Sequence, residues 1–445
     1  MHTLKQLRSG ALAGIRRLDL SAELTQLPDE IFDLADSLEV LNLSGNRLSE
    51  LPDGLARLKK LRVLFCSDNA FTAVPEVLGE CEALEMVGFK ANRIRHLPDN
   101  ALPPALRWLI LTDNALPSLP RGLGARPRLR KLMLSGNRLV GLPESLVECA
   151  ELELLRIAAN QLDALPPWLL QLPRLAWLAF AGNPFSDAWE HASATARPLG
   201  RIPAESVRLG ERLGEGASGV IYAADWLDGD SETPLALKRF KGSMTSDGLP
   251  RCEIAASLTA GRHAHLVSTI GALETHGDER PALLMERLAP SFRALAGPPS
   301  LESCTRDVYP HGQRYPAGTV LRIARGVSAA AGHLHGKGVL HGDLYAHNLL
   351  VEDRGHCLLS DFGAASFFDA ASEDGMRLQR IEARAFGILL GELIDRLDET
   401  VDTALPQALR ALQHECETPQ VLDRPDFRTL CARLDRLAAD VAPAV

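Results

Sequence analysis

The sequence lacks paired cysteines, long apolar runs and an excess of basic residues, and each absence excludes a class of protein. The eight cysteines are scattered without a C-x-x-C pair, so neither a zinc site nor a disulfide framework is indicated, and a reduced, cytoplasmic setting is expected. No apolar run reaches the roughly 18 residues of a membrane helix, and residues 1–14 lack the apolar core of a signal peptide. The net charge of −9 argues against nucleic acid as a partner, which needs a basic surface.

What the chain does contain is a repeat that fills its first half. Asparagines recur in steps of 22 or 23 residues, and prolines keep the same spacing. The asparagines are Asn46, Asn69, Asn92, Asn114, Asn137, Asn160 and Asn183. Each unit reads L-x-x-L-x-L-x-x-N-x-L-x-x-L-P, as in residues 38–52, and so resembles the leucine-rich repeat over about residues 15–188. In such a repeat the leucines turn inward, the asparagine satisfies backbone groups, and stacked units bury what one unit cannot.

The third and fifth strand positions of the repeat are unusually apolar for side chains that point outward. They include Val63, Phe65, Met86, Trp108, Ile110, Met133, Leu154 and Trp177. An exposed apolar patch of this kind is typical of a protein contact. We therefore expect a protein partner or substrate on the concave face, or else the second half of this chain. The alternative is that some of these side chains tuck between their neighbours.

The second half opens with a glycine-rich segment. Gly214, Gly216 and Gly219 form G-x-G-x-x-G, and the residues that follow favour a strand and not the helix of a dinucleotide-binding turn. Glycines let backbone amides approach phosphate closely. Lys238 lies 19 residues after Gly219 in a strand-like L-A-L-K, and Glu253 opens a helical pattern. The order resembles the flap, strand lysine and helix glutamate of eukaryotic-type protein kinases.

Two further motifs lie in residues 338–363, where H-G-D-L-Y-A-H-N is followed by D-F-G. They resemble the catalytic and metal-binding loops of the same family. The resemblance implies that Asp343 accepts the proton of the attacking hydroxyl. It also implies that Asn348 and Asp361, as hard oxygen ligands, bind Mg²⁺ on the phosphates of ATP.

The same resemblance implies where the nucleotide base lies. Residues 283–288 are similar to a kinase hinge with Met285 as gatekeeper, so adenine would bond to the backbone of Glu286 and Leu288. Its ring would lie among Ile221, Ala236 and Leu350. Residues 289–317, with several prolines, are expected to be loop.

The chain departs from the family at several positions. Gly342 stands where many kinases have an arginine that grips a phosphorylated loop, and Tyr345 stands where Ser/Thr kinases have a lysine. His347 could supply a cation instead, or be an ordinary exposed histidine. Glu382 replaces the usual aspartate of a buried helix, and only 18 residues separate it from Gly363, with no A-P-E. The activation and peptide-docking segment is therefore short.

These patterns predict an α/β chain with a leucine-rich-repeat solenoid and N-terminal cap in residues 1–188, a linker in 189–203, and a two-lobed, protein-kinase-like α+β domain in 204–445. The expected function is a bacterial, ATP- and Mg²⁺-dependent Ser/Thr protein kinase. A pseudokinase scaffold is one alternative. A small-molecule phosphotransferase is another, because H-G-D-L is common in aminoglycoside-type kinases.

Overall fold

The computed structural model describes residues 2–196, 200–216, 218–228, 231–245, 247–274, 280–398 and 404–441. The chain divides into two compact units: unit 1 is Met1–Leu172 with Leu301–Thr305, and unit 2 is Pro173–Ser300 with Arg306–Val445. This division differs from the predicted one at two places. The last repeat strand lies in unit 2, and a short segment of the second half lies in unit 1.

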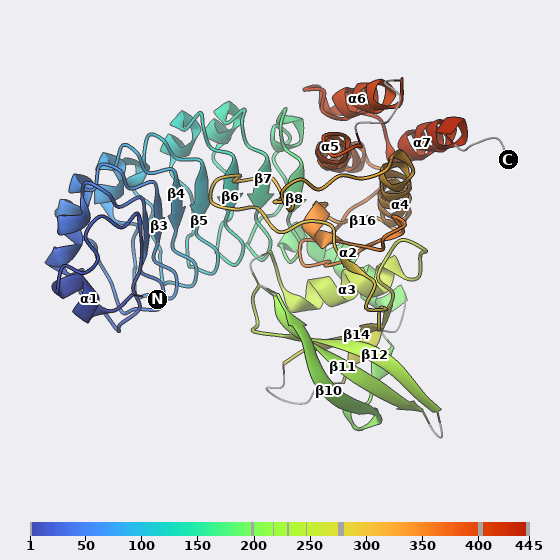
Figure 1. Ribbon diagram of the computed structural model, residues 1–445, viewed down its shortest axis with the longest axis horizontal. Coiled ribbons are helices and arrows are strands. Elements are labelled where there is room, and N and C mark those ends of the chain that lie inside the picture. The colour runs from blue at the N-terminus through green and yellow to red at the C-terminus, as the bar shows by residue number, and fades with distance from the viewer. Residues whose placement is uncertain are drawn as a thin grey trace. The chain divides into compact units, whose positions relative to one another are not determined.

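Unit 1 is built from short parallel strands that alternate with 3-10 turns (Figure 1). Neighbouring strands pair in register, so that Leu18, Leu41 and Leu64 stand opposite one another. The strands are β1 (Arg17–Asp19), β2 (Val40–Asn42), β3 (Val63–Phe65), β4 (Met86–Gly88), β5 (Trp108–Ile110), β6 (Lys131–Met133) and β7 (Leu154–Arg156). The turns are η1 (Asp29–Leu34), η2 (Asp53–Arg57), η3 (Glu76–Glu80), η4 (Asp99–Ala101), η5 (Arg121–Ala125), η6 (Glu144–Glu148) and η7 (Leu169–Gln171).

The asparagines join each repeat to the one before it, as predicted. The side-chain nitrogen of Asn46 donates to the carbonyls of Leu20 and Leu43, and its oxygen accepts from the amide of Leu24 at 3.0 Å. Asn137 makes the same bonds four coils later. Because the turn amides and carbonyls are buried, this ladder satisfies groups that would otherwise be left unpaired. Helix α1 (Leu4–Arg8) forms the cap and begins with a capping box at Thr3.

The predicted binding face is more covered than the sequence suggested. Val63, Met86 and Leu154 are only 5%, 1% and 2% exposed, so the prediction that they are exposed is wrong. Cys304, fully buried, packs against Val63 and Met86, with Phe65 and Trp108 among the partly buried side chains around this cluster. The segment that carries Cys304, Leu301–Thr305, belongs to unit 1 and was expected to be loop. Ile110 and Met133 remain half-buried.

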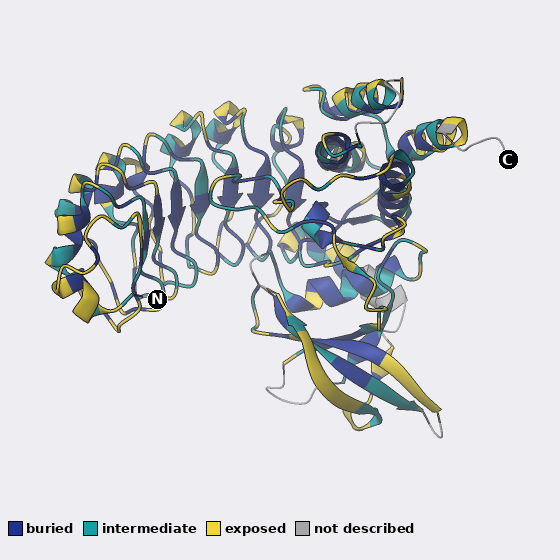
Figure 2. Ribbon diagram, viewed as in Figure 1, coloured by how far each residue is buried: buried dark blue, intermediate teal, exposed yellow. Residues whose placement is uncertain are grey.

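Unit 2 contains a six-stranded sheet in the order β10-β11-β12-β14-β13-β9, antiparallel except for the β13–β9 pair. Its strands are β9 (Arg201–Ile202), β10 (Val207–Glu215), β11 (Gly219–Asp228), β12 (Ser231–Phe240), β13 (Thr269–Leu273) and β14 (Ala282–Glu286). Strand β10 is the exposed edge in Figure 2, whereas β12 buries Leu235 and Leu237 in the core of the sheet. The turn η8 (Ala204–Ser206) precedes β10, and α3 (Pro250–Ala260) carries Glu253.

Helices form the other half of unit 2; α4 and α5 are largely buried, whereas α6 and α7 each expose one face (Figure 2). They are α4 (Ala317–Gly336), α5 (Glu373–Ile394), α6 (Ala404–Cys416) and α7 (Phe427–Val441). Short elements precede or connect them: β15 (Arg293–Ala294) comes before α4, and β16 (Val339–Leu340), η9 (Ala346–Asn348), β17 (Leu349–Val351), β18 (Cys357–Leu359), β19 (Ser366–Phe367) and η10 (Val421–Asp423) lie between the helices. Strand β8 (Trp177–Ala179) and helix α2 (Pro184–Ala196) also belong to unit 2. The predicted linker therefore holds the end of α2 and all of β9.

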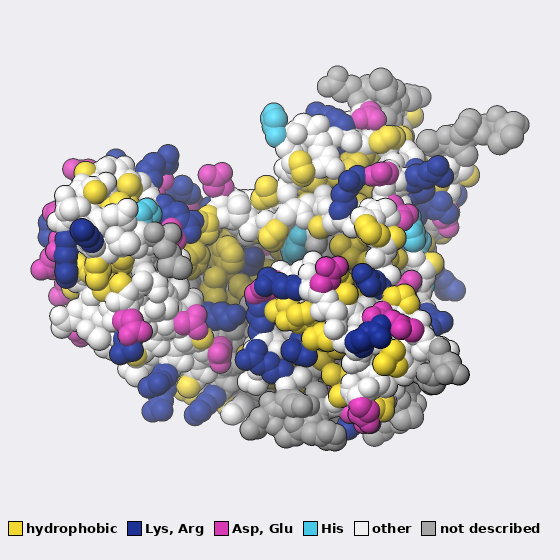
Figure 3. Space-filling model, turned by 60° about the horizontal axis from the view of Figure 1, so that its bottom comes forward, with side chains coloured by type: hydrophobic (Ala, Val, Ile, Leu, Met, Phe, Trp, Pro, Cys, Tyr) yellow, Lys and Arg dark blue, Asp and Glu magenta, His cyan; other side chains and the backbone are white. Residues whose placement is uncertain are grey.

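The surface carries charges of both signs, interspersed on the face shown in Figure 3. In the described part of the chain, no helix is both long and apolar enough to cross a membrane.

Candidate active site

A cleft of about 780 Å³ in unit 2 is lined by the sheet and by the loops after β16 and β18. It brings together most of the residues that the sequence singled out. These are Gly216, Gly219, Ile221, Ala236, Lys238, Glu253, Glu286, Leu288, Asn348, Leu350 and Asp361. Gly214 and Asp343 are not among the lining residues. His347 lines the cleft too, although the sequence left its position open.

The hairpin of β10 and β11 forms a flap over the cleft. The amide of Gly216 donates to the carbonyl of Gly219 at 2.9 Å and closes the turn. A side chain at Gly219 would come within 2.7 Å of the carbonyl of Arg239, so this glycine permits the close approach of β11 and β12. At Gly214 and Gly216 there is open space instead, and a phosphate group could approach the backbone there.

Lys238 lies at the centre of the charged groups in the cleft. Its ammonium contacts Glu253 and lies 3.2 Å from Oδ1 of Asp361. Burial acts to lower the pKa of Lys238, but the charges of Asp361 and Glu253 outweigh it and raise that pKa to about 12. Burial likewise acts to raise the pKa of Asp361, and Lys238 outweighs it and holds the pKa below its ordinary value. Lys238 is therefore a permanent cation next to an ionised carboxylate.

Asp343 and Asn348 form a local pair in the loop after β16. The side-chain nitrogen of Asn348 donates to both the carbonyl and the carboxylate of Asp343, each at 2.9 Å. His341 holds the loop from the other side, with Nε2 3.0 Å from the carbonyl of Ser360. These bonds fix the Asp343 carboxylate, which a general base requires.

The oxygen atoms in the cleft suit Mg²⁺. The bonds of Asn348 to Asp343 use its amide nitrogen, which leaves the amide oxygen to bind a cation. The side chain of Asp361 is 46% exposed, and its Oδ1 accepts from the amide of Gly363 and from Lys238. The described residues hold no cluster of three or more His, Cys, Asp and Glu that would bind a metal alone. The donor set thus fits an ion whose remaining ligands are phosphate and water.

Glu382 holds the backbone of the loop at Gly342, where this sequence has glycine in place of the arginine of many kinases. Its carboxylate accepts from the backbone amide of Gly342 at 2.7 Å, and its other oxygen lies 2.7 Å from Nε2 of His335. Burial acts to raise the pKa of Glu382, but the bond to His335 outweighs it and holds the pKa low. Gly342 has φ +74°, and a side chain there would come within 2.6 Å of the carbonyl of Ala364. The backbone leaves no room for the arginine found in many kinases.

His347 is not an ordinary exposed histidine, because its side chain is only 22% exposed. Its Nδ1 lies 2.7 Å from Oδ1 of Asp307, and its backbone amide donates to Oδ2 of the same carboxylate at 3.1 Å. Burial acts to lower the pKa of His347, but the bond to Asp307 and the charges of Asp343, Asp307 and Asp361 raise it. Sequence reasoning missed Asp307, because no motif surrounds it.

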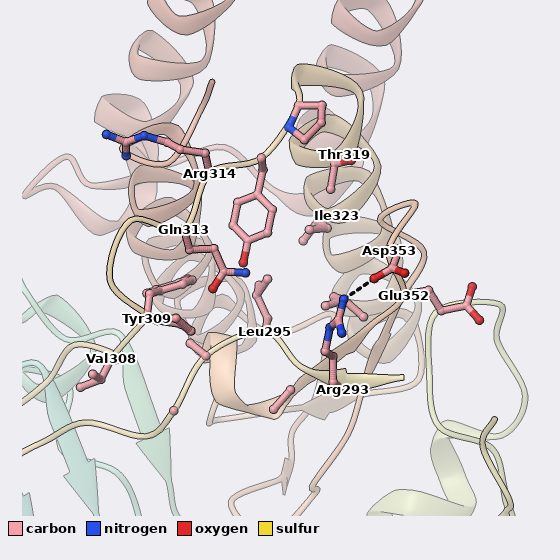
Figure 4. A pocket seen from close by; sticks show the side chains of 17 residues that line it. Arg293, Leu295, Val308, Tyr309, Gln313, Arg314, Thr319, Ile323, Glu352 and Asp353 are labelled. Atoms are coloured by element: carbon pink, nitrogen blue, oxygen red, sulfur yellow. Dashed lines mark hydrogen bonds and ion pairs between the residues drawn. The ribbon is translucent and has the colours of Figure 1, made fainter. Parts of the chain in front are cut away.

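A second cavity of about 680 Å³ lies in unit 2, away from the predicted site residues. Figure 4 shows the side chains of β15, the segment before α4 and α4 itself converging on it. Arg293 forms an ion pair with Asp353 at its edge. Within the described residues, Gln313 Oε1 and the hydroxyl of Tyr315 have no hydrogen-bond partner.

Comparisons with known proteins agree with this geometry. The family described as protein tyrosine and serine/threonine kinase matches residues 207–384, and the leucine rich repeat family matches residues 13–71. CBL-interacting protein kinase 22 of Oryza sativa subsp. japonica is 28% identical over 36% of this chain and 37% of its own length. Cyclin-dependent kinase 11.1 of Caenorhabditis elegans is 27% identical over 35% of this chain and 20% of its own length.

A third relative is the probable inactive serine/threonine-protein kinase roco10 of Dictyostelium discoideum. It is 35% identical over 24% of this chain and 4% of its own length. This chain therefore spans 37% or less of the length of each of these curated relatives.

Proposed function

This chain carries a leucine-rich-repeat region and a protein kinase domain, and on that basis we propose that it transfers the γ-phosphate of ATP to a serine or threonine of a protein. One observation carries the proposal: Lys238 contacts both Glu253 and Asp361 in a cleft large enough for a nucleotide. The lysine is thus already held beside the carboxylate that would bind Mg²⁺.

Each residue has a distinct role in this proposal. Lys238, oriented by Glu253, holds the α- and β-phosphates, and the backbone of the glycine flap covers them. The backbone of Glu286 and Leu288 binds adenine, whose ring lies among apolar side chains of the cleft. Asp343 accepts the proton of the acceptor hydroxyl.

Asn348 and Asp361 would hold Mg²⁺, which when bound neutralises charge on the phosphates. Their oxygen donors and the position of Lys238 support this assignment. His347 also lines the cleft, in a loop that lacks the usual lysine, and it would place a positive charge there when protonated; its bond to Asp307 raises its pKa and so favours that form.

Two alternatives are less well supported. A pseudokinase scaffold is suggested by the name of one relative, but Lys238, Asp343, Asn348 and Asp361 are all present here. A small-molecule phosphotransferase is suggested by H-G-D-L and the short segment after D-F-G. The glycine flap favours a protein kinase. So does the segment Arg424-Pro425-x-Phe427, which resembles the closing segment of that family.

We further propose that the repeats bind the protein partner or substrate. Ile110 and Met133 support this role, because their side chains are only half-buried, whereas Val63 and Met86 are covered by Cys304. Ile110→Glu with Met133→Glu should lower phosphorylation of a protein substrate but leave autophosphorylation unchanged. Val140→Glu is the control, because Val140 is also apolar, lies in unit 1 and is 65% exposed. Equal effects of the two changes would contradict this role.

The test of the catalytic assignment compares two substitutions in the cleft. Asp343→Asn should abolish phosphoryl transfer and leave ATP binding nearly intact, because the base does not hold the nucleotide. Lys238→Met should weaken both. Lys241→Met is the control, since this lysine follows the same strand but pairs with Glu215 at the surface. Transfer undiminished in Asp343→Asn would overturn the assignment.

A further inference from the structure

We infer that the last repeat coil, residues 173–183, is part of the catalytic apparatus, and that Trp177 is a positioning residue for the loop that carries Asp343. The inference rests on the proposed kinase function. Trp177 was expected on the outer, partner-binding face of the repeats. It is instead 1% exposed and lies in unit 2 with the catalytic loop.

Trp177 contacts the loop through two different interactions. Its indole stacks on the ring of Tyr345, with centroids 4.2 Å apart and planes within 8° of parallel. Its Nε1 donates to the carbonyl of Leu344 at 3.1 Å. The guanidinium of Arg306 lies 5.8 Å from the same indole. One side chain therefore holds both residues that directly follow Asp343.

The backbone of the coil contacts the same region. The amides of Phe180 and Ala181 both donate to the hydroxyl of Ser366, at 3.0 and 3.2 Å. Ser366 is fully buried and begins β19, the strand that follows D-F-G. The carbonyl oxygen of Leu178 lies 2.7 Å from the position that a Cβ atom at residue 342 would occupy. The coil thus packs against the loop before Asp343 and the segment after D-F-G.

Two buried arginines hold the coil in place. Arg424 donates from Nη2 to the carbonyl of Pro173 at 2.7 Å, and Arg384 donates from Nε to the carbonyl of Arg174 at 3.1 Å. They are 1% and 5% exposed. Each bond satisfies a partly buried carbonyl of the coil, so two side chains from the helical half of unit 2 hold the coil in place.

This arrangement accounts for the aromatic residue at position 345. The ring of Tyr345 is 4% exposed and covered by Trp177, so it contributes packing where the family has a charge. Asp343 lies two residues before it, and Asn348, which bonds to Asp343, lies three residues after it. A displacement of about 1 Å at a reacting group can cost roughly a hundredfold in rate. Fixing Leu344 and Tyr345 therefore fixes the base.

The test uses the full-length protein with Trp177→Phe and Trp177→Ala, and with Trp108→Phe and Trp108→Ala as matched controls. Trp108 occupies the same strand position in unit 1, where the ammonium of Lys131 lies 4.0 Å from its ring centroid. Trp177→Ala should lower kcat by roughly ten- to a hundredfold, because the base is no longer held. Trp177→Phe keeps an aromatic ring but loses the Nε1 bond, and should lower kcat by about fivefold. The KM for ATP should stay unchanged in all four variants, because Trp177 does not line the nucleotide cleft.

Hydrogen exchange gives a readout that does not depend on activity. The amides of residues 341–348 should exchange faster in both Trp177 variants and at the wild-type rate in the Trp108 controls. Wild-type kcat together with wild-type exchange in folded Trp177→Ala would overturn the inference. If that variant does not fold, as judged by circular dichroism, the same two measurements on Trp177→Phe decide. If the wild type transfers no phosphate, the proposed function fails, and the exchange measurement alone decides the positioning role.

Discussion

Replacing Gly342 by alanine should destabilise unit 2 by about 1–3 kcal/mol more than the same change at Gly312. Both glycines have left-handed backbone angles, with φ of +74° and +72°. Their surroundings differ. A side chain at Gly342 would lie 2.6 Å from the carbonyl of Ala364 and 2.7 Å from that of Leu178, whereas nothing lies within 4 Å at Gly312. Gly312 therefore serves as the matched control.

Two contributions make up the expected loss in the free energy of unfolding. An alanine held in the left-handed region costs about 1–2 kcal/mol at either site. Contact with two backbone oxygens adds the cost of moving packed backbone, about 1–3 kcal/mol, at Gly342 alone. Gly312→Ala should thus lower the free energy of unfolding by about 1–2 kcal/mol, and Gly342→Ala by roughly 2–5 kcal/mol.

Urea unfolding of the full-length variants, followed by circular dichroism, measures this difference. Gly342→Ala should also lower kcat, because the loop that carries Asp343 must shift to admit the methyl group. An equal loss of stability in the two variants would refute the reasoning. It would mean that the backbone angle alone, and not the packing of the last coil, requires glycine at position 342.

Three further predictions concern the elements around this loop. Glu382→Ala should cost about 3 kcal/mol in urea unfolding at neutral pH, because it leaves His335 without its buried partner. Because folding lowers the pKa of Glu382, its contribution to the free energy of unfolding is present above its ordinary pKa of 4.5 and is lost as the pH falls toward the folded-state pKa. If the alanine variant loses as much stability in acid as the wild type does, this prediction is wrong. The hydroxyl of Ser372 caps the N-terminus of α5 by accepting from the amide of Gly375 at 2.9 Å. Ser372→Ala should therefore lower the free energy of unfolding by about 1 kcal/mol and leave kcat unchanged. Phosphatase treatment should leave the rate of transfer unchanged, because the Ser366 hydroxyl is buried; a large loss of rate would show control by loop phosphorylation.

Features that depend on local backbone demands were predictable from the sequence. Each repeat asparagine satisfies amides and carbonyls of adjacent turns, so its spacing alone reveals the ladder. The strand lysine and helix glutamate were predictable because their spacing is fixed by β12 and α3. The structure brings Lys238 into contact with Glu253 accordingly.

What covers a given position was not predictable. The third position of the strand in each repeat was expected to point outward. The period of the repeat cannot tell which of these side chains is covered by another segment of the chain. Trp177 and Leu344 are 167 residues apart, and no local pattern links them. Cys304 likewise lies in a proline-bearing stretch that reads as loop, yet it is fully buried among side chains of unit 1.

The most direct test of the account is to incubate purified full-length protein with γ-labelled ATP, Mg²⁺ and a library of protein substrates, and to locate the label by mass spectrometry. Wild type, Asp343→Asn and Lys241→Met are compared in parallel. We expect label on serine or threonine side chains with wild type and Lys241→Met, and none with Asp343→Asn. Equal labelling by wild type and Asp343→Asn, or label found only on small molecules, would contradict it.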